Sequence, residues 1–516
     1  MNIVEMLEVN TLRHPSKEAL IYQNSTYTYE EFNVKVNQLA HGLVKEGVKK
    51  GDKIAMFMKN SADFVFTYYA GAKIGAILVP INFRLSPKEI NYIMTQSESN
   101  FIVADQEYEE IVYEAIKEIP TVSKQFTAPF AINKRYGSLS KLFIDRTENP
   151  GIQLNGTDDL HLLYTSGTTG LPKGALFDHD RVEAVALQFI LTLNYHSDER
   201  MMNFCPLFHC AQLTIGMLSG FYIGATTVVY RDFNPRVILA DIKKYRITSF
   251  LAVPTMHIAF INTPKDEDIN FSSVEKILYG AAPMSVDVVR KCIDYYGTHQ
   301  MYSLCGQTEG GPNGIVLYPK DHKKHAGMAG KNSSMFTLVD IVNEQGESVE
   351  PGVVGELLFK GPTVMKEYYN NPEATAKTIR DGWLHTGDLA MKDQDGYIQL
   401  VDRNKDMIIS GGENIYSIEV ENTIGMHPKV ADVAVIGSPD TKWGELVTAI
   451  VVKKPNEEVT EQEIIDFTQL NIARFKAPKK VVFVDALPRN ASGKLMKYQL
   501  REAYTESNTL PMGVER

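Results

Sequence analysis

The chain has 516 residues, of which 44% are hydrophobic and 22% are charged, as in an ordinary globular protein. Its 53 basic and 63 acidic side chains give a net charge of −10. This charge argues against a protein that holds nucleic acid through a general basic surface, so no nucleic-acid partner is expected. The length allows about three or four domain-sized units with large buried cores.

The cysteines suit a reducing compartment, and the N-terminus and the apolar runs suit a cytoplasmic protein. None of the four cysteines belongs to a Cys-x-x-Cys pair, which argues against a zinc ribbon or a disulfide framework. The N-terminus carries acids where a signal peptide would have a basic and then an apolar run, and no apolar stretch is long enough to span a membrane. We therefore expect a cytoplasmic protein without a transmembrane segment.

Helical and strand patterns alternate over the first 300 residues. Apolar residues at helical spacing predict helices over Tyr29–Glu46, Ala62–Ala72 and Ser285–Tyr296. Short apolar runs predict buried strands over Ile54–Met58, Ala76–Pro80, Phe101–Ala104, Ala225–Tyr230 and Ser249–Val253. This alternation is typical of an α/β fold of layered subdomains whose strands are largely parallel.

The pattern changes twice further along the chain. From Gly327 to Leu400, short strands separated by Gly and Pro predict a β-rich subdomain with antiparallel hairpins, beginning with a strand over Phe336–Val339. Beyond Asp402 the chain restarts as an α+β unit, in which Thr460 caps a helix. We expect an N-terminal domain of residues 1–402 and a C-terminal domain of residues 403–516.

The segment Tyr164–Gly174 carries the strongest chemical signal. Its glycines let backbone N–H groups approach phosphate oxygens, and its hydroxyls and lysine add donors and charge. It is not a Walker A loop, which makes a P-loop NTPase a poor interpretation. On composition alone, a flexible polar loop is an equally good interpretation. The candidate phosphate-binding residues are Thr165, Ser166, Gly167, Thr168, Thr169, Gly170 and Lys173.

Six motifs in order resemble those of the adenylate-forming superfamily, which includes acyl-CoA synthetases, adenylation domains and firefly luciferase. They are Tyr164–Gly174, Tyr279–Pro283, Cys305–Glu309, Trp383–Asp388, Asp402–Asp406 with Ser410–Asn414, and Pro488–Lys494. The resemblance covers nearly the whole chain. It implies a large N-terminal domain, a small mobile C-terminal domain, and ATP, Mg²⁺ and CoA as cofactors.

The resemblance also implies the reaction. A carboxylic acid attacks the α-phosphate of ATP, which gives acyl-AMP and pyrophosphate, and CoA then displaces AMP to form a thioester. Two anions meet in the first step, so cations and oriented donors are needed at the developing charge. Lys494 matches the catalytic lysine, and Glu309 with Thr168 would bind Mg²⁺ on ATP. His209 matches a residue beside the acid in acyl- and aryl-CoA ligases.

Further matches assign nucleotide and CoA contacts. Those for adenine and phosphate are Gly280, Ala281, Ala282, Pro283, Cys305, Gly306, Gln307 and Thr308, and those for ribose are Asp388 and Arg403. Those for the hinge and the pantetheine tunnel are Lys405, Gly411, Gly412, Glu413 and Trp443. Cys305 stands where the family usually has a tyrosine that stacks on adenine, a departure that puts this stacking contact in doubt. The sequence to residue 516 contains no carrier-protein domain and no Ser attachment motif of one, so we expect free CoA as the thiol.

Simpler interpretations stand beside these roles. Lys494 alone would be a surface lysine, Glu309 a solvated loop acid and His209 a core histidine.

The preferred function is a ligase for medium- or long-chain fatty acids. An aryl-acid–CoA ligase and an enzyme that loads a separate carrier protein are the alternatives. A catalytically silent acyl- or nucleotide-binding protein is the alternative of a different class. A peripheral membrane contact and a homodimer are left open.

Overall fold

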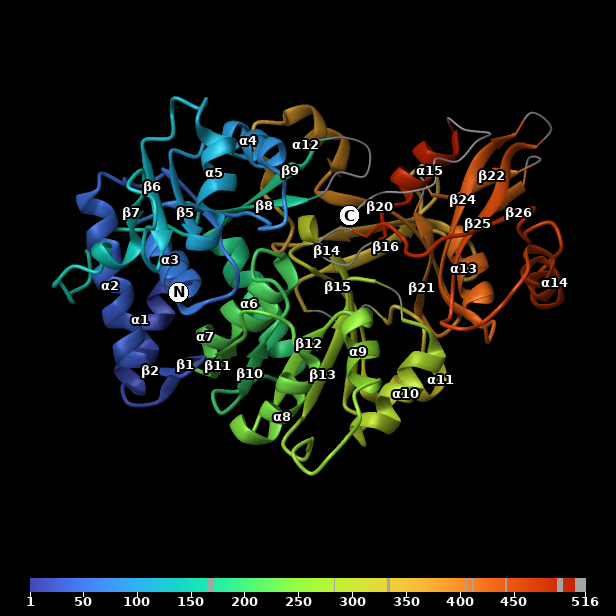
Figure 1. Ribbon diagram of the computed structural model, residues 1–516, viewed down its shortest axis with the longest axis horizontal. Helices are drawn as coiled ribbons and strands as arrows, with labels where there is room; N and C mark the ends of the chain where they lie inside the picture. Colours follow the sequence, from blue (N-terminus) through green and yellow to red (C-terminus); the bar gives the residue numbers. More distant parts are fainter. Residues whose placement is uncertain are drawn as a thin grey trace. The chain divides into compact units, whose positions relative to one another are not determined.

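The computed structural model divides into two compact units (Figure 1). It describes residues 1–165, 171–282, 284–331, 335–403, 406–410, 413–440, 443–489 and 495–505. Unit 1 comprises residues 1–167, 171–339 and 359–385, and unit 2 comprises residues 168–170, 340–358 and 386–516. The boundary after residue 402 stays a prediction.

One eight-stranded sheet of unit 1 has the order β18-β9-β8-β4-β3-β5-β6-β7. These strands span Glu367–Tyr368, Lys173–Asp178, Asp159–Thr165, Ile77–Pro80, Lys53–Phe57, Phe101–Asp105, Lys124–Ala128 and Gly137–Ser138. Strands β8 to β7 are parallel, whereas β9 and β18 add an antiparallel edge. The predicted strands over Ile54–Met58, Ala76–Pro80 and Phe101–Ala104 are confirmed as β3, β4 and β5.

The second eight-stranded sheet of unit 1 has the order β15-β14-β13-β12-β10-β11-β1-β2. These strands span Asn313–Leu317, Met301–Gln307, Lys276–Gly280, Ser249–Ala252, Arg200–Asn203, Thr226–Val229, Glu18–Tyr22 and Ser25–Thr28. Only the edge strands β15 and β2 are antiparallel to their neighbours. Parallel strands end at one edge of a sheet, where loops of an α/β fold gather functional residues.

Helices connect the strands of both sheets, as the alternating pattern predicts. They are α1 (Ile3–Arg13), α2 (Tyr29–Lys45), α3 (Ala62–Lys73), α4 (Pro87–Gln96), α5 (Glu109–Ile116), α6 (His179–Leu193), α7 (Ser219–Ile223), α8 (Pro235–Tyr245), α9 (Pro254–Ile261), α10 (Val286–Tyr296), α11 (His322–His325) and α12 (Pro372–Thr378). A π-helical segment, η3, spans Gln212–Leu218. Figure 1 shows α8, α9 and α10 beside β12 and β13. No helix among the described residues is long and apolar enough to cross a bilayer.

A five-stranded sheet confirms the predicted β-rich segment. It contains β16 (Leu338–Val342), β17 (Gly355–Lys360), β20 (Trp383–Lys392), β19 (Ile379–Arg380) and β21 (Ile398–Arg403), with β20 antiparallel to β19 and β21. The strand predicted over Phe336–Val339 is misplaced, because β16 begins two residues later. The buried Thr337 hydroxyl instead bonds the side chains of Gln188 and Thr363, each at 3.2 Å.

Unit 2 also holds the predicted C-terminal α+β fold. Its strands are β23 (Glu413–Ile415), β22 (Ile408–Ser410), β25 (Gly444–Lys453), β24 (Val430–Asp440) and β26 (Lys480–Phe483), and its helices are α13 (Ser417–Gly425), α14 (Glu461–Asn471) and α15 (Lys497–Thr505). The Thr460 side chain accepts a hydrogen bond from the Glu463 backbone at 3.2 Å and caps α14, as predicted. Valine and alanine side chains from β24 and β25 pack with isoleucine and valine side chains of α13 and α14 to form the core.

Two buried histidines lie on and next to the hairpin of β8 and β9. His179 begins α6, and neither of its ring nitrogens has a hydrogen-bond partner among the described residues. Burial lowers the pKa of His179 to about 4, against the opposing effects of Asp158 and Asp178. His161 on β8 lies 2.7 Å from the Tyr68 hydroxyl, and burial lowers its pKa to about 3. Both rings are therefore neutral in the folded protein at pH 7.

We expect His179 to make the protein less stable in acid. Between pH 6.5 and 4 the unfolded histidine binds a proton and the folded one does not, so the free energy of unfolding falls as the pH falls. From pH 7 to 5 this amounts to roughly 2 kcal/mol. Urea unfolding measures how far the free energy of unfolding falls between pH 7 and pH 5. In His179→Phe this fall should be smaller than in wild type by about the same amount. In His14→Phe, at an exposed site, it should equal that of wild type. An unchanged pH dependence in His179→Phe would contradict the assignment.

Candidate active site

The hairpin of β8 and β9 holds both ends of the predicted phosphate-binding loop. Tyr164 faces Gly174 and Thr165 faces Lys173 across the antiparallel pair. Gly174 leaves room for the Tyr164 ring, because a Cβ there would lie 3.1 Å from that ring. The loop residues Ser166, Gly167, Thr168, Thr169 and Gly170 lie outside the described residues.

Helix α4 fixes both ends of this loop. The Tyr92 hydroxyl donates to the Pro172 carbonyl at 3.1 Å, and the Tyr164 hydroxyl donates to the Gln96 side-chain oxygen. The Gln96 amide nitrogen in turn donates to the Tyr369 carbonyl at 2.7 Å. Because Tyr92 and Gln96 lie one helical turn apart, a single face of α4 holds the start and the end of the loop.

The Glu309 carboxylate lies in the turn after β14 and is only 8% exposed. The Tyr368 hydroxyl donates to its Oε1 at 2.7 Å, and the Lys173 ammonium lies 4.8 Å from the centre of the Tyr368 ring. Strand β18 carries Tyr368 and pairs with β9, which carries Lys173. The fold thus brings the predicted metal-binding carboxylate to the base of the predicted phosphate loop, and its second oxygen could hold a divalent cation.

His209 connects to the same turn through Cys210. The Cys210 sulfur lies 3.1 Å from the Thr308 hydroxyl and 3.7 Å from His209 Nδ1. Burial raises the pKa of the Cys210 thiol to about 12, so it is protonated and is a packing group rather than a nucleophile. The structure therefore places His209, Thr308 and Glu309 along one line of contacts, and their roles in binding stay a prediction.

The predicted adenine segment follows β13, at the carboxyl edge of the second sheet. Gly280 pairs with Leu304 on the parallel strand β14, and a Cβ on Gly280 would lie 2.3 Å from the Leu304 carbonyl oxygen. Ala281 has a φ of +65°, which turns the chain sharply after the strand. Exposed backbone of this kind can take a flat ring; Ala281, Ala282 and Gly306 are exposed, and Cys305 and Gln307 are partly buried. Pro283 lies outside the described residues.

Unit 2 contains the predicted ribose and CoA residues. Asp388 on β20 faces Arg403 on β21, and the carboxylate Oδ1 lies 3.1 Å from the guanidinium Nε. The Lys479 ammonium lies 3.3 Å from the centre of the Trp443 ring, and Glu413 is exposed at the start of β23. The remaining predicted residues, Lys405, Gly411, Gly412 and Lys494, lie outside the described residues.

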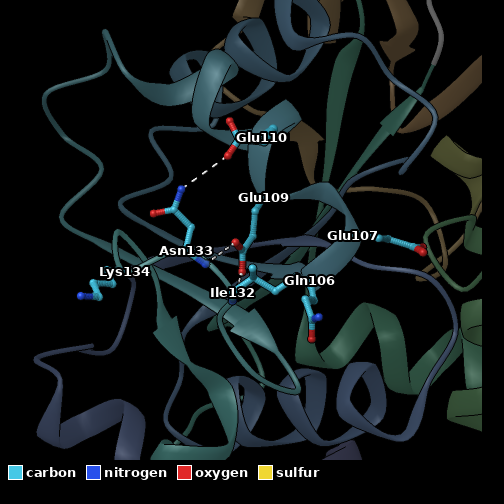
Figure 2. A pocket seen from close by; sticks show the side chains of 7 residues that line it. All are labelled: Gln106, Glu107, Glu109, Glu110, Ile132, Asn133 and Lys134. Carbon is cyan, nitrogen blue, oxygen red and sulfur yellow. Dashed lines mark hydrogen bonds between the residues drawn. The ribbon is translucent and has the colours of Figure 1, made fainter.

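A surface hollow of about 510 Å³ lies elsewhere in unit 1, between α5 and the loop after β6 (Figure 2). The Glu109 carboxylate accepts hydrogen bonds from the backbone of Ile132 and Asn133, each at 2.8 Å. Glu107 and Glu110 add further negative charge to the rim. An acidic rim repels carboxylates and phosphates, so this hollow does not fit the predicted substrates.

Sequence reasoning missed the three residues that position the site, Tyr92, Gln96 and Tyr368. Each reaches a partner far away in the chain, and the Tyr368–Glu309 contact spans 59 residues. A tyrosine in an edge strand has no local signal that distinguishes a ligand-positioning hydroxyl from a core ring. Only the pairing of β18 with β9 shows the difference.

Two largely parallel sheets, a glycine- and hydroxyl-rich segment between β8 and β9, and a buried carboxylate at the end of β14 define a nucleotide-binding α/β enzyme. Comparison with known proteins gives the family. The AMP-binding enzyme family model matches residues 7–369, and the AMP-binding enzyme C-terminal domain model matches residues 419–494. The chain belongs to this family, within the acyl-CoA synthetases, which are AMP-forming acid–thiol ligases.

Individual relatives align over almost their full length. The feruloyl-CoA synthase of Amycolatopsis sp is 35% identical over 95% of this chain and 96% of its own. The long-chain-fatty-acid–CoA ligase FadD13 of Mycobacterium tuberculosis is 34% identical over 99% of each chain. The structure of the Bacillus subtilis o-succinylbenzoate-CoA synthetase MenE with its acyl-adenylate is 30% identical, with a TM-score of 0.86 over 97% of this chain and 98% of that one.

We expect Tyr368→Phe to slow acid-dependent pyrophosphate release about 10- to 100-fold, because a hydrogen bond to a charged group contributes about 1.5–3 kcal/mol. The half-saturating Mg²⁺ concentration should rise with it, since the Glu309 carboxylate loses the donor that orients it. Tyr369→Phe is the matched control, because the Tyr369 hydroxyl contacts Glu98 on the surface at 2.7 Å. An equal loss in both variants would argue against a specific role for Tyr368.

Proposed function

We propose that the protein is an ATP- and Mg²⁺-dependent carboxylic acid–CoA ligase for medium- or long-chain fatty acids. The observation that carries this proposal is the buried Glu309 carboxylate, fixed by Tyr368 beside the Lys173 end of the phosphate loop. A buried anion next to an ammonium and a loop rich in donors suits a metal-bound triphosphate. The MenE structure, whose title names an acyl-adenylate, supports the same intermediate here.

The individual roles extend the proposal. Glu309 and Thr168 hold Mg²⁺, and the loop from Thr165 to Gly170 holds the phosphates with Lys173. The segment from Gly280 to Pro283 and the one from Cys305 to Thr308 take the adenine and the α-phosphate. Asp388 and Arg403 take the ribose hydroxyls. Each assignment uses a donor or acceptor that suits the group it contacts.

The small C-terminal domain supplies the remaining groups. Lys494 neutralises the charge that develops as the acid attacks the α-phosphate. The domain, which we propose to begin at residue 403, then turns about Lys405. Gly411, Gly412, Glu413 and Trp443 line the path of the CoA thiol, which displaces AMP from the acyl carbon.

The acid is proposed to lie against the apolar cluster next to His209. Leu251, Leu278 and Leu304 pack together there with the partly buried Ala211. Apolar walls suit an alkyl chain, and the similarity to a long-chain-fatty-acid–CoA ligase supports it. An aryl acid is the second candidate, favoured by the similarity to a feruloyl-CoA synthase.

Product analysis tests the proposal. With ATP, Mg²⁺, CoA and a panel of alkyl and aryl acids, we expect AMP, pyrophosphate and an acyl-CoA thioester identified by mass. Lys494→Ala should slow adenylation 100-fold or more, as loss of a transition-state donor does, and leave thioester formation from preformed acyl-AMP nearly intact. Lys454→Ala, an exposed lysine of unit 2, is the control. ADP as product, or pyrophosphate without thioester, would contradict a CoA ligase.

A further inference from the structure

Two buried amide side chains meet at the start of the π-helical segment. Asn203 ends β10 and is fully buried, and Gln212 begins η3 and is 1% exposed. The Gln212 Nε2 donates to the Asn203 Oδ1. Both residues lie among apolar side chains of the second sheet and of η3, where each polar atom needs a partner.

The bond between the amides leaves one donor and one acceptor unused. Neither Gln212 Oε1 nor Asn203 Nδ2 has a hydrogen-bond partner among the described residues. If oxygen and nitrogen are exchanged in both amides, one donor and one acceptor are still left unpaired. This count therefore does not depend on how the two amides are oriented. Each unpaired buried group costs about 1–3 kcal/mol, so the pair favours a ligand that pairs with both atoms.

The backbone is adapted to this amide pair. A Cβ on Gly216, one turn along η3, would lie 2.1 Å from both Asn203 Oδ1 and Gln212 Nε2. Any larger residue at 216 would displace the bonded atoms. A π-helical segment is itself an uncommon conformation that is frequent at functional sites.

Gln212 lines a cavity of about 10 Å³ between η3 and strands β10, β12 and β13. Most of the other lining is apolar, including Met201, Leu251 and Leu278. The hydroxyls of Tyr195 and Ser249 also line it and lie 3.0 Å apart, bonded to each other. The volume suits a single water-sized group, such as one hydroxyl, and not a run of methylenes.

Gln212 is close to the candidate active site along the chain, and residues of both belong to one apolar cluster. Gln212 follows His209 by three residues, and the Leu213 N–H donates to the His209 carbonyl at 3.1 Å. Leu251 and Leu278 from the cavity belong to the same apolar cluster as Ala211 and as Leu304, the neighbour of Cys305. This shared cluster makes the amide pair a candidate contact for the far end of an acid whose carboxylate lies beside His209.

We propose that the acid activated by this enzyme carries a hydroxyl group at its far end, which Gln212 and Asn203 recognise. A hydroxyl can accept a hydrogen bond, which Asn203 Nδ2 needs, and can donate one, which Gln212 Oε1 needs, so its chemistry matches both unpaired atoms. A terminal methyl satisfies neither and leaves two buried polar atoms unpaired, which discriminates strongly against it. This inference rests on the proposed function and narrows its acid to hydroxylated alkyl or aryl acids.

Matched acid pairs test this inference. Each pair has one carbon skeleton with and without a terminal hydroxyl, in an alkyl series of graded length and an aryl series. In wild type we expect kcat/KM for thioester formation to favour the hydroxylated member of the best pair by about 100-fold. Gln212→Met, which keeps the side-chain length, and the double variant Gln212→Met with Asn203→Leu should reduce this preference to below about threefold by lowering kcat/KM for the hydroxylated member.

The controls separate a binding role from a structural one. Gln188→Leu removes another buried amide, which bonds Thr337, and it should change both members of a pair equally. Equal kcat/KM within every pair in wild type, or a preference unchanged in Gln212→Met, would overturn the inference and make the amide pair a site for buried water. Absence of thioester with every acid would instead overturn the proposed function.

Discussion

The hydrogen bond from Tyr368 to Glu309 is the contact on which the candidate active site of unit 1 depends. It holds a buried carboxylate, which needs a donor because its desolvation is costly. The strand that carries Tyr368 pairs with β9 at the edge of the first sheet, whereas Glu309 follows a strand of the second sheet. One hydrogen bond thus joins the two sheets at the point where the phosphate loop begins and ends.

The net negative charge of the chain means that an anion-binding site needs individually positioned cations and donors. A protein with a net charge of −10 offers no general attraction to ATP or to a carboxylate. Cations and hydrogen-bond donors must therefore be positioned one by one. Lys173 is an example, because its ammonium lies against the ring of Tyr368, whose hydroxyl donates to Glu309. The acidic hollow around Glu109 shows the converse, because its size alone gives it no affinity for an anion.

Much of the fold follows from hydropathy, and less of the site does. Strands buried on both faces appear as short apolar runs, so β3, β4 and β5 are predicted to within a residue. The strand expected from Phe336 begins at Leu338. The Thr337 side chain is buried through hydrogen bonds to Gln188 and Thr363, and hydropathy does not predict such bonds. Motifs make Glu309 and His209 candidates, whereas Gln96 and Tyr368 act through partners distant in sequence, which no local pattern encodes.

The apolar cluster that contains Ala211 and the pair of amides at Asn203 and Gln212 would select substrates by different properties. Apolar walls alone would accept any acid of suitable length, because one methylene changes binding by only about 1–3 kcal/mol. Two unpaired amide atoms add a requirement that length cannot meet. Because the folded protein bears their cost whether or not substrate is bound, a purely stabilising role would favour apolar side chains at positions 203 and 212. The amides at positions 203 and 212, packed against Gly216, therefore fit the proposed role of pairing with a ligand.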